Sequence, residues 1–367
     1  MKLNRLIALA LCAVSLVGCE NENKIPDWFT PTGEMVEIGL GDEGSRVSLE
    51  YENNKDNLYW VAGDKIGIYC AQAASTAQGY AECANVPATI EEANLSADKK
   101  SATVYPQIEY NAQAQAHTFY VYYPWSTMGG VDAETPVITG LQLPRTQDGN
   151  VANSTIAWAT KTVTRNEQTG NFGRIDGIKL ITPFAYVRFC FASSTAQTKK
   201  ISSVMMEAVT GTATTKTENG KVVKVVTVTG SDNSAVFSGT YTADFSKSPI
   251  SGAEGTEYPE EGAITFTAKS NAITVEQEAE ITVQKYDRTK GALMHINSSA
   301  FAADGKFFRI TVMFDDGSYA ITVKDAKNFE ANHIYNYGFN IDNFVQETET
   351  EIYVEPWHLI ECNVAFD

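Results

Sequence analysis

Few residues in this sequence combine the types and the spacing that catalysis requires. The histidines are His117, His295, His333 and His358, and no two of them are four residues apart, as a metal-binding pair on one helix face would be. The sequence patterns of serine hydrolases, zinc proteases, phosphate loops and EF-hands do not occur. We therefore expect a protein that is not an enzyme, with no catalytic residues, no metal and no cofactor.

Residues 39–44 read Gly-Leu-Gly-Asp-Glu-Gly and match the glycine pattern of a dinucleotide-binding loop. Such a loop must open a helix whose N-terminus faces the pyrophosphate. Here the pattern is followed by Ser-Arg-Val-Ser-Leu at residues 45–49, which is typical of a strand. We therefore predict a glycine-rich connection between two strands and no nucleotide site.

The cysteines could form a disulfide bond or remain as thiols. Outside the N-terminal region they are Cys70, Cys83, Cys190 and Cys362, and these allow three pairings that sequence alone does not distinguish. We favour a bond between Cys70 and Cys83, because they flank a short polar segment, and closing it would stabilise the fold by about 3 kcal/mol. Cys190 lies in an apolar run, where a buried thiol is expected.

The N-terminus predicts export. Two basic residues, Lys2 and Arg5, precede an apolar run over residues 6–17, which fits a secretory signal and is shorter than the roughly 20 residues that a membrane span needs. The run ends in Leu-Val-Gly-Cys at residues 16–19, which resembles a bacterial lipobox, in which the cysteine thiol carries a diacylglycerol.

We accordingly predict a lipoprotein signal peptide over residues 1–18 and lipidation of Cys19. Residues 19–34 are then a lipidated tether between the membrane and the folded part, and it begins with the polar run Glu-Asn-Glu-Asn-Lys at residues 20–24. The expected location is the outer membrane, with the protein exposed at the cell surface.

The charge of the chain excludes one class of partner. The sequence has 28 Lys and Arg against 45 Asp and Glu, a formal net charge of −17. Binding to nucleic acid requires basic patches, so we expect no nucleic-acid partner.

Alternating or β-rich segments recur along most of the chain, so we predict an all-β fold built of sandwiches. The predicted strands cover residues 36–40, 47–51, 66–69, 118–123, 186–191, 222–228, 263–267, 281–284, 307–314 and 319–323. Asn219-Gly220 and Asp316-Gly317 predict hairpin turns. The best helix-like stretches are residues 90–95 and 155–160.

A length of 367 residues usually means two domains. We place their boundary near residues 172–178, where Asn-Phe-Gly at 171–173 precedes a new run of strands. This gives an N-terminal β-sandwich domain over residues 35–175 and a C-terminal one over residues 176–367.

Five segments resemble the fimbrillin family, the shaft and accessory subunits of type V pili and their relatives. In chain order they are Leu-Tyr-Trp-Val-Ala-Gly-Asp-Lys-Ile-Gly-Ile-Tyr at 58–69, Phe-Tyr-Val-Tyr-Tyr-Pro-Trp at 119–125, Leu-Pro-Arg-Thr-Gln-Asp-Gly at 143–149, Phe-Glu-Ala-Asn-His-Ile-Tyr at 329–335 and Ile-Tyr-Val-Glu-Pro-Trp at 352–357. Asn332 stands where the family usually has Gly, and Asn also accepts the left-handed conformation.

The resemblance implies two tandem transthyretin-like Greek-key β-sandwich domains and a fimbrial structural or adhesion subunit. It also implies assembly by strand exchange, in which a protease removes the first strand after an Arg and the terminal strand of another subunit fills the groove. The implied partners are other pilus subunits, as a homo- or heteropolymer, and a host or bacterial surface receptor.

Applied to this chain, the removable strand would carry Val36, Ile38 and Leu40, and the processing site would be Arg46. The apolar face of a C-terminal donor strand would consist of Ile360, Cys362, Val364 and Phe366. The alternatives are that the first strand stays paired and that the C-terminal strand completes its own domain.

A second hypothesis is a surface lipoprotein that binds glycans as a non-catalytic module. It would use exposed aromatic side chains, namely Tyr59, Trp60, Tyr122, Tyr123 and Trp125. The strand-like spacing of these residues favours core packing.

Overall fold

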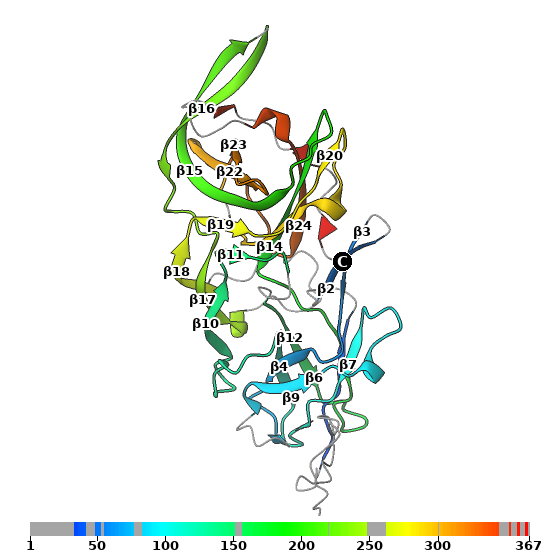
Figure 1. Cartoon of the computed structure of the whole chain (residues 1–367). Coiled ribbons are helices and arrows are strands. Elements are labelled where there is room, and N and C mark those ends of the chain that lie inside the picture. The colour runs from blue at the N-terminus through cyan, green and yellow to red at the C-terminus, as the bar shows by residue number, and fades with distance from the viewer. Residues whose placement is uncertain are drawn as a thin grey trace, which may run out of the picture.

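The structure, a computed structural model, describes residues 33–41, 48–52, 55–76, 83–150, 156–218, 220–247, 262–299, 301–344, 352–353, 358–359 and 364–365. The molecule is elongated, with most strands of the N-terminal half towards one end and most of those of the C-terminal half towards the other (Figure 1). The fold is all-β, as predicted, and the helical segments among the described residues are short 3-10 turns: η2 (Glu92–Asn94), η4 (Phe245–Lys247), η5 (Arg288–Lys290) and η6 (Ile341–Asn343).

The N-terminal half contains two sheets that face one another. One has the order β13-β1-β7 and consists of β1 (Ile38–Leu40), β7 (Ala102–Val104) and β13 (Ile175–Ile178). The other has the order β12-β9-β4-β6 and consists of β4 (Lys65–Tyr69), β6 (Val86–Thr89), β9 (Ala116–Tyr123) and β12 (Ala157–Thr164). Two small pairs accompany them: β2 (Ser48–Glu52) with β3 (Lys55–Tyr59), and β5 (Ser75–Thr76) with β8 (Ile108–Glu109).

The C-terminal half contains the larger sheets. The seven-stranded sheet consists of β11 (Thr146–Gln147), β15 (Ile201–Glu218), β16 (Lys221–Ser231), β19 (Ala272–Val275), β22 (Lys306–Phe314), β23 (Tyr319–Asp325) and β25 (Ile352–Tyr353). The six-stranded sheet consists of β14 (Phe184–Ser193), β20 (Ile281–Val283), β21 (Ala292–Asn297), β24 (His333–Asn340), β26 (His358–Leu359) and β27 (Val364–Ala365).

Strands from both halves pair with one another. In a three-stranded sheet, β10 (Val137–Leu143) pairs with β17 (Ser238–Asp244), which pairs in turn with β18 (Ile264–Ser270). The short strand β11 pairs in parallel with β19. The chain therefore passes from the first half into the sheets of the second before it returns to the first in β12.

Separate hydrophobic cores account for this arrangement. One core fills the space between the two N-terminal sheets, and its members include Ile38, Ile68 and Phe119. A second lies between the large C-terminal sheets and includes Phe189 and Ile310. A third joins the halves and consists of Tyr69, Ala84, Tyr122, Ala133, Ile138, Leu143, Ile156, Trp158, Phe184, Tyr241, Ala243, Phe245 and Ala263.

The predicted strands are confirmed, since each predicted segment overlaps an observed strand. The predicted turn at Asp316-Gly317 connects β22 to β23, and Gly317 has a φ of 80°. Asn332 has a φ of 59°, so it does adopt the left-handed conformation expected where the family usually has Gly.

The prediction of a helix over residues 155–160 was wrong. Residues 157–164 form β12, which pairs antiparallel with β9 from Ala157 opposite Tyr123 to Thr164 opposite Ala116. The side chain of Trp158 is buried in the core that joins the halves. Tertiary packing therefore overrides the local preference of this alanine-containing segment. The other helix-like stretch, residues 90–95, contains only the single turn η2.

Residues 175 and 176, between which we placed the domain boundary, lie inside β13. That strand pairs in parallel with β1, so residues 175–178 share a sheet with the first strand. The strand that follows, β14, is buried along its whole length and belongs to the C-terminal six-stranded sheet.

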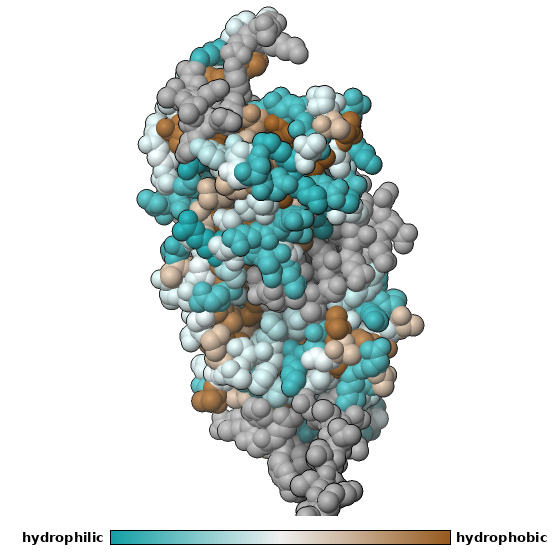
Figure 2. Space-filling view, viewed as in Figure 1, coloured by the Kyte–Doolittle hydropathy of each residue, from teal (hydrophilic) through white to brown (hydrophobic). Residues whose placement is uncertain are grey.

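The face of the molecule seen in Figure 2 is largely hydrophilic, with small scattered hydrophobic areas. Among the exposed apolar side chains, Val131 and Val222 have exposed fractions of 85% and 74%. None of the helices in the described residues has the length and hydropathy needed to cross a membrane.

Candidate functional site

The first strand of the fold, β1, lies in the middle of its sheet. On one side it pairs antiparallel with β7, with Ile38 opposite Val104 and Leu40 opposite Ala102. On the other side it pairs in parallel with β13, with Ile38 opposite Ile175. A strand that precedes all others in the described chain thus fills a slot between two strands that come much later.

Backbone hydrogen bonds hold the segment around β1 on both sides. Towards β8, the N–H of Val36 donates to the carbonyl of Ile108 at 2.9 Å, and the carbonyl of Glu34 accepts from the N–H of Tyr110 at 2.9 Å. Towards β13, the carbonyl of Glu37 accepts from Ile175 at 2.9 Å, and the N–H of Gly41 donates to Ile178 at 2.8 Å. Both edges of the segment are therefore occupied.

The apolar side chains of this segment are buried as the alternating pattern predicts. Val36, Ile38 and Leu40 have exposed fractions of 2%, 0% and 2%, and all three belong to the N-terminal core. Burying one side chain of this size stabilises a fold by roughly 1.5–3 kcal/mol. The segment therefore contributes both a central set of ladder bonds and a central part of the core.

A single arginine covers the opposite face of β1. Arg174 donates from Nη1 to Glu37 in the first segment at 2.8 Å, from Nε to Asp176 on β13 at 2.5 Å, and from Nη2 to Thr103 Oγ1 on β7 at 3.2 Å. One side chain therefore bridges all three strands of the sheet. We had not identified Arg174 from the sequence, because its partners are close only after the strands pair.

The start of the segment is held by a carboxylate. The two side-chain oxygens of Glu34 accept from the backbone N–H groups of Phe172 and Gly173 at 2.8 and 2.6 Å. The ring of Phe172 stacks on Tyr110, with centroids 4.7 Å apart, and meets His117 edge-on at 4.4 Å. This aromatic cluster adjoins the end of the slot at which β1 begins.

Removal of β1 would leave two requirements to be met. If β1 left, β7 and β13 would keep the ladder groups that now bond to it, and the apolar core behind them would be open to solvent. An extended segment with alternating apolar side chains could satisfy both requirements, because main-chain bonds supply affinity and the side-chain pockets supply specificity. Here the pockets are those of Val36, Ile38 and Leu40.

The C-terminal strand is paired within its own chain in the structure. Val364 lies in β27, opposite Ile334 of β24, and β26 pairs with β24 at Leu359 and His358. Within the described residues, each of these strands is two residues long and pairs with one neighbour. The terminal strands therefore have a smaller hydrogen-bonding ladder than β1.

Several predicted site residues lie outside the described residues. They are Cys19, Arg46, Ile360, Cys362 and Phe366. The described residues nearest to Arg46 are Gly41, after the end of β1, and Ser48, at the start of β2.

The predicted bond between Cys70 and Cys83 is not present, and both residues are buried free thiols. The N–H of Cys70 donates to the carbonyl of Cys83 at 3.0 Å, so backbone pairing joins the two segments without a covalent bond. Burial raises the pKa of the Cys70 thiol to about 12. Burial, followed by the neighbouring Cys70, raises the pKa of Cys83 well above its ordinary value. The third thiol, Cys190, is buried as predicted.

The aromatic residues proposed for glycan binding do not form an exposed platform. Trp60, Tyr122 and Tyr123 are buried, with exposed fractions of 2%, 0% and 5%, and pack in the cores. Tyr59 and Trp125 are partly buried. The glycan hypothesis therefore loses the residues on which it was based.

Two of the histidines are structural. His117 and His295 are buried, with exposed fractions of 0% and 1%, and burial lowers the pKa of His117. Across the part of the chain that the structure describes, no group of three His, Cys, Asp or Glu side chains is arranged to hold a metal ion.

Comparison with known proteins gives one family. A family model described as fimbrillin-like matches residues 46–357. No curated protein matches the chain.

Several solved bacterial proteins are similar in structure to this chain. A candidate cell adhesion protein from Bacteroides ovatus is 12% identical, with a TM-score of 0.49, covering 90% of this chain and 99% of its own. One from Bacteroides uniformis is 14% identical, with a TM-score of 0.47, covering 85% of this chain and 94% of its own. The fimbrial anchor protein Mfa2 from Porphyromonas gingivalis is 12% identical, with a TM-score of 0.25, covering 58% of this chain and 79% of its own.

Proposed function

The chain belongs to the fimbrillin-like family, and we propose that it is a fimbrial or adhesion subunit that assembles at the cell surface by strand exchange. Proteolysis after Arg46 would separate the segment that carries Val36, Ile38 and Leu40 from the rest of the chain. The vacated slot between β7 and β13 would then accept the C-terminal strand of another subunit, with Ile360, Cys362, Val364 and Phe366 facing the core.

The observation that carries this proposal is the place of β1. It is central in its sheet and buried in its core, yet it is the first described strand, so one cut behind it detaches it from everything that follows. The proposed cut lies between β1 and β2, in a glycine-containing connection. Exposed loops of small and polar residues are preferred sites of proteolysis.

The energetics favour replacement over an empty slot. Loss of β1 exposes the apolar pockets of three side chains and two unpaired ladders, and each buried polar group left without a partner costs about 1–3 kcal/mol. A donor strand whose described residues pair with β24 alone would gain neighbours on both sides. The donor segment would therefore replace a short ladder with one neighbouring strand by a longer ladder with two neighbouring strands.

The proposal includes the attachment of the protein to the cell. We infer that Cys19 is lipidated and that the tether of residues 19–34 holds the folded part at the outer membrane. Incorporation of labelled palmitate into the wild-type chain but not into Cys19→Ala tests this part separately.

Limited trypsin digestion tests the assembly step. The full chain carrying Cys19→Ala, to prevent lipidation, is digested and then concentrated, and its size is followed by gel filtration and by gels run in SDS without boiling. We expect a cut after Arg46, followed by slow formation of SDS-resistant ladders. Arg46→Ala should prevent both, whereas Arg145→Ala, at an exposed arginine away from this connection, should change neither.

The assembly proposal fails if the protein cut after Arg46 stays monomeric at high concentration. It also fails if Arg46→Ala forms the same ladders as the parent chain. In either case the first strand would be a permanent part of the fold.

A further inference from the structure

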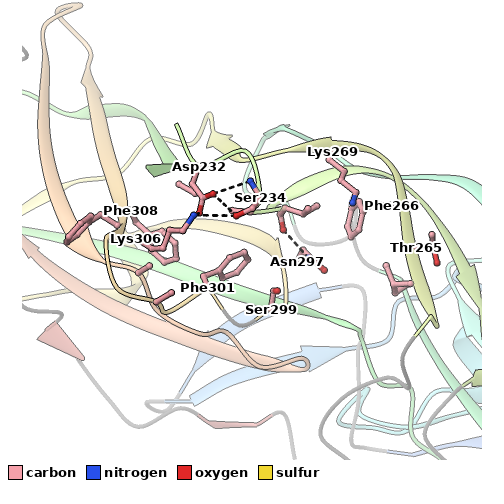
Figure 3. A pocket seen from close by; sticks show the side chains of 17 residues that line it. Asp232, Ser234, Thr265, Phe266, Lys269, Asn297, Ser299, Phe301, Lys306 and Phe308 are labelled. Carbon is pink, nitrogen blue, oxygen red and sulfur yellow. Dashed lines mark hydrogen bonds and ion pairs between the residues drawn. The ribbon is translucent and has the colours of Figure 1, made fainter. Parts of the chain in front are cut away.

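A cavity in the C-terminal half lies outside the site described above. It has a volume of about 430 Å³ and is lined by β18, by the start of β22 and by residues of the segments 232–236, 297–299 and 301–303. Figure 3 shows Asp232, Ser234 and Lys306 on one side of it, Lys269 and Phe266 on the other, and Asn297 between them. Its volume is within the range of pockets that bind small ligands, about 300–1,000 Å³.

One side of the cavity is a fixed ion pair. Asp232 is 8% exposed, and its Oδ2 lies 2.7 Å from Lys306 Nζ. Its Oδ1 accepts from the hydroxyl and the backbone N–H of Ser234 at 2.6 and 3.1 Å. Burial alone would raise the pKa of Asp232, but the hydrogen bonds from Lys306 and Ser234 outweigh it, and the pKa lies below its ordinary value. The carboxylate is therefore charged and neutralised by Lys306.

The other side carries a cation without a counterpart. Lys269, near the end of β18, makes no ion pair or side-chain hydrogen bond with any residue that the structure describes. With Lys306 paired to Asp232, the charged side chains around the cavity leave one positive charge, on a chain whose formal net charge is −17. Such a local excess of positive charge attracts an anionic ligand.

The remaining lining offers hydrogen bonds and apolar surface. The Asn297 amide donates to the carbonyl of Val236 at 3.0 Å, which leaves its side-chain oxygen without a partner among the described residues. The hydroxyl of Ser299 also has no partner there. The half-buried ring of Phe266 and the ring of Phe301 add apolar surface.

We propose that this cavity binds an acidic saccharide, a sugar ring that carries a carboxylate. The carboxylate pairs with Lys269, the ring hydroxyls bond to Asn297 and Ser299, and an apolar face of the sugar contacts Phe266. A simple carboxylate would leave the hydroxyl partners unused, and a neutral sugar would leave Lys269 unpaired. The cavity shares no residue with the slot of β1, so this binding does not depend on strand exchange.

Titration of the uncut full chain tests the proposal. Glucuronate and galacturonate serve as probes, with glucose, galactose and acetate as matched comparisons, and binding is followed by calorimetry and by ligand-observed NMR. We expect the uronates to bind about tenfold more tightly than either the neutral sugars or acetate, since a hydrogen bond to a charged group contributes about that much. Higher salt should weaken the uronates alone.

Variants identify the site. Lys269→Ala should weaken uronate binding about tenfold and leave neutral-sugar binding unchanged, because it removes one charge-assisted hydrogen bond. Lys269→Glu should abolish uronate binding. Ser299→Ala should weaken sugars but not acetate, and Lys285→Ala, at an exposed lysine outside the cavity, should change nothing.

Three results would overturn the proposal. Equal binding of neutral and acidic sugars would remove the role of charge, and equal binding of acetate would make this a simple carboxylate site. Uronate binding that Lys269→Ala leaves unchanged, or its absence in the parent chain, would separate the cavity from saccharides altogether.

Discussion

The guanidinium of Arg174 lies against Gly39, with Nη2 2.7 Å from the position that a Cβ of Gly39 would occupy. The missing side chain thus leaves room for the arginine to cross the first strand and to reach Glu37, Asp176 and Thr103. The first strand is in this way held by a surface side chain that is partly exposed, at 42%. Solvent-accessible bonds of this kind are weak individually and easily broken.

Arg174→Ala should therefore loosen β1 without unfolding the protein. Loss of these partly exposed contacts should lower the free energy of unfolding by about 1 kcal/mol or less. Hydrogen exchange at the backbone amides of Ile38–Leu40 should become faster, since local opening requires fewer contacts to break. Mass spectrometry of peptides covering these residues measures the effect.

Arg145→Ala is the control, because Arg145 is exposed and lies far along the chain from the first strand. It should leave exchange at β1 unchanged. Equal acceleration in both variants, or none in Arg174→Ala, would contradict the role of Arg174 in holding the strand.

The buried side chains of β1 should contribute more to the free energy of unfolding than the contacts of Arg174 do. Ile38→Ala removes a side chain that is 0% exposed and should lower the free energy of unfolding by about 2–5 kcal/mol, the range for such cavities. Val131→Ala, at a residue that is 85% exposed, should change it by less than about 0.5 kcal/mol. Urea denaturation measures both, and a small effect of Ile38→Ala would mean that the first strand adds little to the core.

Asp64 should make stability depend on pH. Burial raises its pKa from 3.8 to about 6, against the opposing hydrogen bond from Val61. Because the folded-state pKa is the higher one, the contribution of this carboxyl to stability is complete below pH 3.8 and is lost as the pH rises through about 6. Asp64→Asn keeps an acceptor for the Val61 N–H but never ionises.

Asp64→Asn should thus melt at a higher temperature than the wild type at pH 7.5 and at a similar temperature near pH 3.5. Asp98→Asn provides a control of opposite sign, since hydrogen bonds from Ser96 and the Lys100 backbone lower the pKa of Asp98. Asp98→Asn should not melt at a higher temperature than the wild type at pH 7.5. Melting curves across this pH range would contradict the assignment if the Asp64 difference did not shrink on acidification.

The sequence predicts the local features of this fold well, but it predicts contacts between residues far apart in the chain poorly. Alternation of apolar residues correctly predicts the burial of Val36, Ile38 and Leu40, because period-two patterning reports which face of a strand meets a core. The turn residues Asp316-Gly317 predict the β22–β23 hairpin for an equally local reason. The pairing of β10 with β17 joins residues about a hundred positions apart, and no short pattern marks it.

The candidate site shows the same division. The alternating residues of β1 predict that strand without any knowledge of its neighbours. By contrast, Arg174, Glu34 and Thr103 make their contacts only when three separate segments come together. Trp158 makes a related point, since its neighbours favour a helix until the pairing with β9 decides otherwise. The cavity around Lys269 was also missed, because its lining comes from distant turns and strands.

The reactivity of the buried thiols tests whether Cys70 and Cys83 are free in the purified protein. With Cys12, Cys19 and Cys362 replaced by Ser, only Cys70, Cys83 and Cys190 can react with a thiol reagent. At pH 8 the folded protein should react at least about a hundredfold more slowly than the urea-unfolded protein, because the thiolate is the reactive form and burial suppresses it. When the protein is unfolded in the absence of reductant, all three thiols should react. Only one reactive thiol would show that Cys70 and Cys83 are bonded in the protein as it is purified.

Removal of residues 360–367 separates the two halves of the assembly proposal. In the structure this segment includes β27, which pairs only with β24 among the described strands, so its loss should lower stability slightly and leave the slot of β1 intact. Trypsin should still cut after Arg46, yet the cut protein should form no ladders on its own, because it has an acceptor slot and no donor. Added to cut full-length chains it should end their growth at one end, so the ladders become shorter as its proportion rises. Undiminished ladders from the truncated chain alone would mean that a different segment fills the slot.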